Sequence, residues 1–578
     1  MAELQRLSDL AKKISGRLTG NTLTLILPYF ILYTLFLVSI SYMRFLEFYT
    51  TNWDMGLNMQ EMWTTTHGYL MYDSAEYQFF GTLSHLEIHT SYIGIPVAYI
   101  YAISPGVLTI IVIQSVAVSL SAVVLFFLAL EITSDVRLSL AAVLIYSFNG
   151  TLITSVLFDY HWLSFVPLEV FLLFYALRKK RFVWAVPTIA AGCLTQDVFP
   201  FIAMGVLLFH FIETRNFNRN PLTLIFGNAG AIYVFLVAEC LLFFLFLRFL
   251  QLNFIPQLLG NQSAIPIIRT YVIEKLSLPT FNLSNLSEVE SYWLISYACM
   301  GFLPILKPRH FVMVAPWLYE TLFGLHKSVT FGYMYSFVTL SLLAPALIYS
   351  FKEIYDEERK VRLKVILPII VFLAVILTYL FMNGYSVWLL ITHYKLWFEV
   401  AAAAGVGTFA ALLIVMRVIP QLRLSFRPSF LIVVLIISLL LFNFGISPLN
   451  SNNDPQLGGY SFSYHVPSQA AYINTIEANI PNHSLILASN NLFPLVADHR
   501  NSYSMFWFYS NLVFSPFNGS RPPDYLLIDT SEMAQVPHWL ISMINNDTLG
   551  LKLEITGNSY PGNIYLYELG YHGSTILN

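Results

Sequence analysis

The sequence predicts an all-α polytopic membrane domain of about 13 transmembrane helices, followed by a small C-terminal α/β domain outside the membrane. Hydrophobic residues make up 57% of the 578 residues and charged residues only 11%, and the mean hydropathy is +0.64. A soluble domain carries roughly 25% charged residues, so this chain cannot cover a globular surface of its size with polar groups. The composition therefore excludes a cytosolic enzyme, a secreted enzyme and a disordered scaffold.

Residues 1–20 form a basic segment that precedes the first apolar run, Thr22–Met43. That run lacks a small-residue cleavage site, so we expect it to stay in the protein as the first span of a membrane domain at 21–446. Several of the expected spans are shorter than the ~20 residues that a straight span needs. The expected spans are approximately 22–43, 107–130, 138–157, 162–177, 182–194, 198–213, 222–249, 291–306, 311–324, 336–351, 365–382, 397–416 and 429–445.

Basic residues orient these spans. With the N-terminus inside, most of the 30 Lys and Arg residues fall on short inner segments, such as Arg178–Arg181, and the long outer regions hold few. By the positive-inside rule, the N-terminus is cytoplasmic and the C-terminal domain lies outside the cell membrane. The net charge of −3 does not favour nucleic acid as a partner, which leaves membrane lipids and small substrates.

Two outer regions are long enough to carry a site: the first outer loop, residues 44–106, and the C-terminal region. The C-terminal region begins with a linker at 447–460, rich in Asn, Gly and Pro, and continues as an α/β domain at 461–578. We expect a helix at Pro467–Ile480, ended by the proline that follows it. The short apolar runs expected to form strands are Leu485–Ala488, Tyr525–Ile528, Leu551–Ile555 and Ile564–Tyr567.

Carboxylate and imidazole side chains, which can act as general bases and bind hard cations, gather on the outer side. Asp159 and His161 occupy the outer turn after the third span, and Asp197 lies in the next outer turn. Plainer interpretations stay open: Asp73 and Glu76 can be solvated, and Asp159 with His161 can cap a span end. The acids and histidines that the first outer loop offers include Asp54, Glu61, His67, Asp73, Glu76, His85, Glu87 and His89.

The stretch Asn52–Trp63 (NWDMGLNMQEMW) directly follows the first span. It resembles an uncharacterised family of prokaryotic membrane proteins, domain of unknown function 2079, whose first outer loop carries the pattern Phe-Asp-Leu-Gly-x-x-x-Gln-x-x-Trp. Asp54, Gly56, Gln60 and Trp63 match this pattern. The family's lysine before its Glu-Asp pair and its histidine before a later tyrosine are absent. The resemblance extends over essentially the whole chain, through His85, Phe158–His161, Gln196–Asp197, Gly332–Tyr335 and Pro523–Tyr525.

That family in turn resembles the GT-C glycosyltransferases, which use polyprenyl-phosphate-linked sugars and carry an outer Asp or Glu just after the first span. The resemblance implies a GT-C-like domain with Asp54 as the catalytic carboxylate. Asp54 would act as a general base, its pKa raised by desolvation, or would bind Mg²⁺ or Mn²⁺ together with Asp159 and His161. The donor would be a polyprenyl- or dolichyl-phosphate-linked sugar, and the acceptor a glycan, lipid or protein. Expected substrate-binding residues are Gln60, Glu61, His85, Asp197 and Tyr335, and the cations available for the lipid phosphate are Arg248, Arg269, Lys327 and Lys395.

Two other functions stay open. A transporter or export component of the cell envelope would use the outer acids as a permeation or proton-relay site, but transporters usually show internal repeats and sites near the bilayer midplane. This sequence has no evident repeat, and its acids cluster outside the bilayer instead of at its midplane. A surface-anchoring or receptor protein would make the C-terminal domain the functional part. The sequence also lacks a Gly-rich phosphate loop, which disfavours a nucleotide-sugar donor.

Overall fold

A computed structural model gives the fold of the chain. The structure describes residues 2–214, 228–262, 265–276, 286–323, 333–355, 439–440, 443–444, 447–449, 465–505, 516–517, 521–557, 561–573 and 575–577. The expected spans 365–382 and 397–416, most of 429–445 and most of the linker lie outside these residues. So do Lys327 and Lys395.

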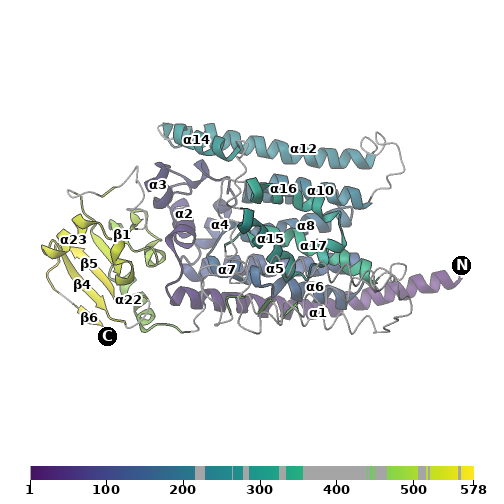
Figure 1. Ribbon diagram of the computed structural model, residues 1–578, viewed down its shortest axis with the longest axis horizontal. Coiled ribbons are helices and arrows are strands. Elements are labelled where there is room, and N and C mark those ends of the chain that lie inside the picture. Colours follow the sequence, from purple (N-terminus) through teal and green to yellow (C-terminus); the bar gives the residue numbers. More distant parts are fainter. Residues whose placement is uncertain are drawn as a thin grey trace.

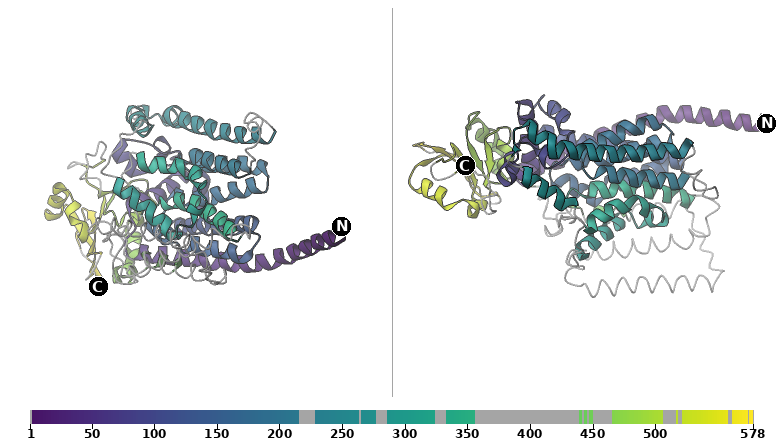
Figure 2. Two further views of the ribbon diagram at one scale, coloured as in Figure 1. Left: turned by 45° about the vertical axis from the view of Figure 1, so that its right-hand side comes forward. Right: turned by 90° about the horizontal axis from the view of Figure 1, so that it is seen from above.

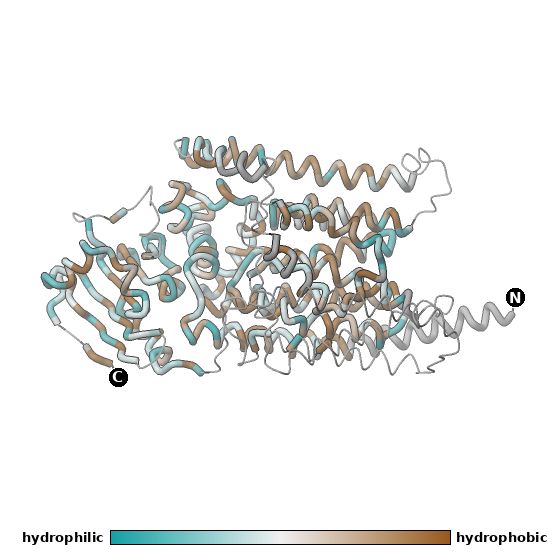
Figure 3. Tube along the Cα trace, viewed as in Figure 1, coloured by the Kyte–Doolittle hydropathy of each residue, from teal (hydrophilic) through white to brown (hydrophobic). Residues whose placement is uncertain are grey.

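Long apolar helices run side by side along the long axis of the molecule (Figure 1). The first is α1 (Ala2–Leu46), followed by α5 (Val107–Thr133) and α12 (Asn228–Phe249). Within the described residues, three stretches are long and apolar enough to cross a membrane: Thr24–Leu46, Val107–Thr133 and Gly230–Leu258. These helices confirm the expected membrane character, and hydrophobic residues dominate them in Figure 3.

The expected span 138–157 is instead two helices, α6 (Val136–Ser147) and α7 (Gly150–Phe158), bent by 46° relative to each other. Asn149 causes the new start, because its side chain caps α7 by accepting a hydrogen bond from the Thr151 N–H. The count of 13 spans is therefore not established in the described part of the chain. The remaining bundle helices are α8 (Val166–Arg178), α9 (Phe182–Thr195), α10 (Phe199–Thr214), α15 (Leu286–Cys299), α16 (His310–Phe323) and α17 (Ser336–Tyr355).

The first outer loop folds into short helices at one end of the bundle, opposite the N-terminus (Figure 1). Its stretch Ser91–Ser104 contains α4 (Gly94–Tyr101), which leaves Tyr99 and Ile100 exposed. The other elements of the loop are the π-helical turn η1 (Asn52–Gly56), α2 (Leu57–Thr66), α3 (Ser74–Phe80) and the 3₁₀ turn η2 (His85–Glu87).

The C-terminal region forms a small sheet domain, as expected, with strand order β2-β1-β3-β5-β4-β6. β2, β1 and β3 are parallel, whereas β5 pairs antiparallel with both β3 and β4. β2, β6 and α23 (His538–Asn545) were not expected, and the expected helix at Pro467–Ile480 is a 3₁₀ turn, η10 (Ser468–Tyr472), followed by α22 (Ile473–Ala478). The strands are β1 (Ile486–Ala488), β2 (Ser502–Ser504), β3 (Tyr525–Asp529), β4 (Leu549–Ile555), β5 (Ile564–Leu569) and β6 (Thr575–Leu577).

The α/β domain lies directly against the first outer loop, at the end of the molecule far from the N-terminus, in all three views (Figures 1 and 2). One buried hydrophobic cluster contains side chains of both parts, including Met59 of the loop and Phe493 and Val496 of the domain. The Tyr101 hydroxyl donates a hydrogen bond of 2.5 Å to Asp498 Oδ1. The domain therefore covers the loop and shares a core with it.

Candidate functional site

Asp54 lies in the π-helical turn η1, which joins the end of α1 to α2. Single π turns are uncommon and occur frequently at functional sites. The turn packs tightly under the α/β domain, because a Cβ atom at Gly56 would lie 2.4 Å from Phe493 Cδ1. Only glycine permits this approach without displacing the phenylalanine ring. The Asp54 side chain is consequently buried, with 6% of the residue exposed.

Asp159 comes from a different part of the chain, immediately after α7. Its Oδ2 accepts hydrogen bonds from the Thr51 N–H at 3.0 Å and the Thr51 hydroxyl at 2.8 Å. Its backbone carbonyl accepts from Gln114 of α5, and its Oδ1 is buried without a hydrogen bond. Arg44, in the last turn of α1, donates to the neighbouring Phe158 carbonyl at 3.3 Å. Asp159 is thus tied to the residues that lead into η1.

Asp54 and Asp159 act on each other electrostatically, and we call them the Asp54–Asp159 pair. Burial raises the pKa of Asp54 well above its usual range, and the negative charge of Asp159 raises it further. Burial raises the pKa of Asp159 to about 7, against the opposing effects of the Arg44 charge and the Thr51 donors. A buried carboxylate whose pKa lies near 7, as that of Asp159 does, can exchange protons with a substrate near neutral pH.

His161 follows the pair but already has a structural role. Its Nδ1 accepts the Leu163 N–H at 3.0 Å, and the backbone N–H of His161 donates to Gln114 Oε1 at 3.0 Å. Burial lowers the pKa of His161 to about 3, and the positive charge of His85 contributes in the same direction. Because Nδ1 accepts the hydrogen bond from Leu163, the neutral imidazole carries its proton on Nε2, and neither ring nitrogen offers a free lone pair to a metal in this arrangement. The shared metal-binding role of Asp54, Asp159 and His161 therefore stays a prediction.

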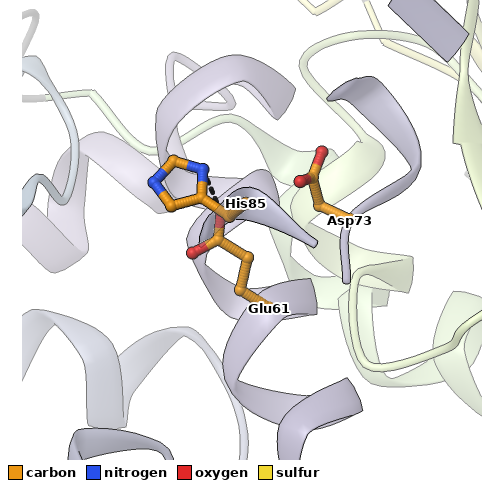
Figure 4. A group of neighbouring side chains, drawn as sticks. All are labelled: Glu61, Asp73 and His85. Carbon is orange, nitrogen blue, oxygen red and sulfur yellow. Dashed lines mark ion pairs between the residues drawn. The ribbon is translucent and has the colours of Figure 1, made fainter. Parts of the chain in front are cut away.

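A second group of titratable side chains lies deeper in the first outer loop. This acid–histidine cluster consists of Glu61 on α2, Asp73 and Glu76 at the start of α3, and His85 on η2. His85 Nδ1 lies 3.0 Å from Glu61 Oε1 and 3.0 Å from Glu76 Oε1. Figure 4 shows Glu61, Asp73 and His85 converging from three segments, and their ligand atoms lie within 4.8 Å of one another.

All four residues of the cluster are buried, so the solvated alternative for Asp73 and Glu76 is wrong. Asp73 caps α3, where its Oδ1 accepts the Glu76 N–H at 2.7 Å. The Asp-x-x-Glu spacing is a capping-box pattern, and this signal could have placed both residues at a helix start. No comparable signal in the sequence indicates that His85 folds back onto them.

The cluster shifts the pKa values of its members strongly. Burial raises the pKa of Glu61 to about 7, although His85 opposes the shift. Burial, together with Glu76 and Glu61, raises the pKa of Asp73. For His85, burial lowers the pKa, but the two neighbouring glutamates outweigh it and raise the pKa well above its usual value. The cluster can hold positive charge, as a proton or as a metal ion.

Residues 44–403 match the protein family described as Predicted membrane protein (DUF2079). The chain belongs to this family. The match includes the Asp54–Asp159 pair and the acid–histidine cluster. It ends before the α/β domain, so the resemblance at Pro523–Tyr525 lies outside it. No curated protein matches the chain. Family membership and the apolar helices together identify a membrane protein.

In this DUF2079 protein, Gln60 joins the first outer loop to the α/β domain. Its Nε2 donates to the His499 carbonyl at 2.8 Å and to the Ser502 carbonyl at 3.1 Å. Its Oε1 accepts the Ser74 N–H at 2.7 Å. Gln60 is fully buried, so the structure gives it a bridging role. Its expected contact with substrate stays a prediction.

The remaining expected residues of the DUF2079 protein are spread over the bundle. Arg248 does not present a free cation to solvent, because it pairs with Asp197 at 3.0 Å and donates to Gln251 at 2.6 Å. Arg269, on α14 (Ile265–Leu276), is exposed. The Tyr335 ring packs at 6.2 Å from the ring of Trp317 within the bundle. Among the described candidate cations, Arg269 is thus the exposed one.

Proposed function

We propose that this DUF2079 protein is a multi-pass membrane glycosyltransferase of the GT-C type, with its N-terminus in the cytoplasm. It transfers a sugar from a polyprenyl-phosphate-linked donor on the outer face of the membrane, and Asp54 is the catalytic carboxylate. The observation that carries the proposal is the Asp54–Asp159 pair, placed where the first long helix leaves the bundle and the α/β domain begins to cover it.

The reaction requires a base. The acceptor hydroxyl attacks the anomeric carbon of the donor, a new C–O bond forms, and the bond between that carbon and the phosphate oxygen breaks. Asp54 takes the hydroxyl proton, and the polyprenyl phosphate leaves with the bonding electrons. A base works best when its pKa lies near the working pH, and burial beside Asp159 moves the Asp54 pKa in that direction.

The location of the pair also supports this function. A lipid-linked donor stays in the bilayer, so the reacting group must lie near a membrane surface. Asp54 follows the candidate span Thr24–Leu46 closely in sequence, and Asp159 ends α7, the second helix of the bent pair. Hydrophilic residues become frequent at this end of the molecule (Figure 3).

The test measures lipid-linked sugars in cells that lack the gene. We expect a polyprenyl-phosphate sugar to accumulate and to disappear when wild-type protein is restored, but to persist with Asp54→Asn. Asp135→Asn is the control for the same chemical change elsewhere, because Asp135 caps α6 through backbone hydrogen bonds and asparagine can replace it there. If the Asp54→Asn protein also makes the accumulated lipid-linked sugar disappear, Asp54 is not the catalytic carboxylate. No accumulation without the gene would favour the transporter.

Orientation has its own test. A cysteine at Ser451 should react with an impermeant thiol reagent in whole cells, whereas one at Lys180 should not. The three native cysteines, Cys193, Cys240 and Cys299, are buried, so background labelling should be low. The reverse pattern would place the site in the cytoplasm and contradict the proposed donor.

A further inference from the structure

The acid–histidine cluster buries more carboxylate oxygens than it supplies with hydrogen-bond donors. Oδ2 of Asp73 and Oε2 of Glu76 are buried without a hydrogen bond, and Glu61 Oε1 has His85 Nδ1 as its partner at 3.0 Å. Glu61 is 0% exposed, and Asp73 and Glu76 are each 2% exposed. Unsatisfied buried polar atoms are rare in folded proteins, and each one calls for an explanation such as a bound ion.

Positive charge is scarce in the cluster. Of the described groups that act on Glu61 and Asp73, the positively charged one is His85. When all three carboxylates are ionised, one imidazolium cannot balance them, and a second cation is needed to stabilise that buried charge. The Asp54–Asp159 pair differs here, because Arg44 acts on it directly.

The ligand atoms are spaced for a metal ion. The nearest ligand atoms of Glu61, Asp73 and His85 all lie within 4.8 Å of one another. In a tetrahedral zinc site with ligand atoms about 2.1 Å from the ion, two ligand atoms lie about 3.4 Å apart, so the present spacing is wider by roughly 1 Å. Small side-chain rotations would therefore close the site. In Figure 4 the three side chains already converge on one region.

The ligand types select the kind of ion. Two carboxylates and one imidazole suit first-row transition ions such as Zn²⁺ and Mn²⁺. Calcium takes six to eight oxygen ligands, and magnesium keeps most of its water, so both fit a dry site with a nitrogen ligand less well.

We infer that Glu61, Asp73 and His85 form a binding site for one divalent transition-metal ion, separate from the Asp54–Asp159 pair. The ion displaces the proton on His85 Nδ1 and lies between this atom and the Glu61 carboxylate, with Asp73 as the third ligand and Glu76 beside the site. It joins α2, the start of α3 and η2, so it fixes the fold of the first outer loop. The inference does not depend on the proposed glycosyl transfer.

The experiment uses the full chain, purified in detergent with an affinity tag that contains no histidine. The protein is stripped with EDTA, dialysed separately against Mn²⁺ and Zn²⁺, and analysed for bound metal by mass spectrometry. We expect one equivalent per chain and a melting temperature raised by a few degrees, because an ion that binds only the folded state stabilises it. No bound metal, or no stabilisation, would overturn the inference.

Conservative variants locate the ion. Glu61→Gln and Asp73→Asn keep the size of each side chain and should each weaken binding by at least about tenfold. Glu532→Gln is the matched control, because Glu532 is an acid of the α/β domain that accepts a hydrogen bond from the Asn490 N–H. It should bind metal as the wild type does. Unchanged binding in the two cluster variants would contradict the site.

A spectroscopic measurement remains informative if a variant folds poorly. Bound Mn²⁺ in the wild-type protein should show magnetic coupling to one imidazole nitrogen in pulsed electron paramagnetic resonance. The coupling should vanish in His85→Gln and persist in His161→Gln. Loss of the coupling in His161→Gln would move the ion to the Asp54, Asp159 and His161 group.

Discussion

The Asp54–Asp159 pair and the acid–histidine cluster lie in neighbouring parts of one folded loop, yet they compensate buried charge in different ways. In the pair, Thr51 donates two hydrogen bonds to Asp159, and the Arg44 charge acts on it from the end of α1. In the cluster, three carboxylates surround a single imidazole, and several of their oxygens accept no hydrogen bond.

This difference separates two chemical tasks. A carboxylate that is partly compensated can gain and lose a proton near neutral pH, as a general base must. A group with excess negative charge attracts a cation instead. The comparison therefore predicts that changes at the pair alter turnover, whereas changes at the cluster alter metal content and stability.

The largest effect is expected for Asp54→Asn. Loss of a general base typically lowers a rate by 10²–10⁴-fold, and asparagine keeps the size of the side chain, so transfer should fall by that factor without a change in melting temperature. Glu76→Gln should instead change the melting temperature and leave the rate of transfer within about tenfold of the wild-type rate. Equal losses of activity in both variants would erase the distinction between the two groups.

Gly56→Val tests the close packing of the α/β domain against the turn η1, which carries Asp54. The new Cβ would meet Phe493 Cδ1 at 2.4 Å, so overpacking should destabilise the protein by about 1–3 kcal/mol, visible as a lower melting temperature. Phe493→Ala in the same chain should restore part of the loss. A double variant no more stable than Gly56→Val would show that the contact is not the cause.

Asp159→Asn isolates the electrostatic coupling within the pair. Asparagine can still accept from Thr51, but its neutral side chain no longer raises the pKa of Asp54. The Asp54 pKa should fall, so the acid limb of the pH–rate profile should move to lower pH. An acid limb that stays in place would show that Asp54 does not sense Asp159.

The smallest effect is expected at His161, which lies near both groups. His161→Ala removes the acceptor for the Leu163 N–H and should cost about 1 kcal/mol in unfolding free energy. His161→Asn should recover most of this loss, because asparagine caps helix starts well. A loss of metal in His161→Ala would instead assign this histidine to an ion.

The sequence predicts which titratable residues the first outer loop contains, but it does not predict which of them lie together in the fold. The stock of acids and histidines at 54–89 could be predicted from composition and topology. The convergence of Glu61 and His85 could not, because it depends on how α3 and η2 fold back on α2, which is a tertiary effect.

The same limit applies to the fold. Apolar strands such as Tyr525–Asp529 could be predicted, whereas Ser502–Ser504 and Thr575–Leu577, at three residues each, are too short to indicate strands without their neighbours. The break between α6 and α7 was missed because an apolar run continues on both sides of it. The capping role of Asn149 depends on a backbone direction that hydropathy does not report.

The Gln60 side chain binds the α/β domain by donating hydrogen bonds to the main-chain carbonyls of His499 and Ser502. A hydrogen bond to a carbonyl constrains where the backbone runs and leaves the identity of the residue open. During evolution, side chains at those two positions can change without breaking this attachment. The family match ends before the α/β domain. The same loop is therefore able to bind C-terminal domains of different sequence, provided that each domain places two main-chain carbonyls where the Gln60 side chain can reach them.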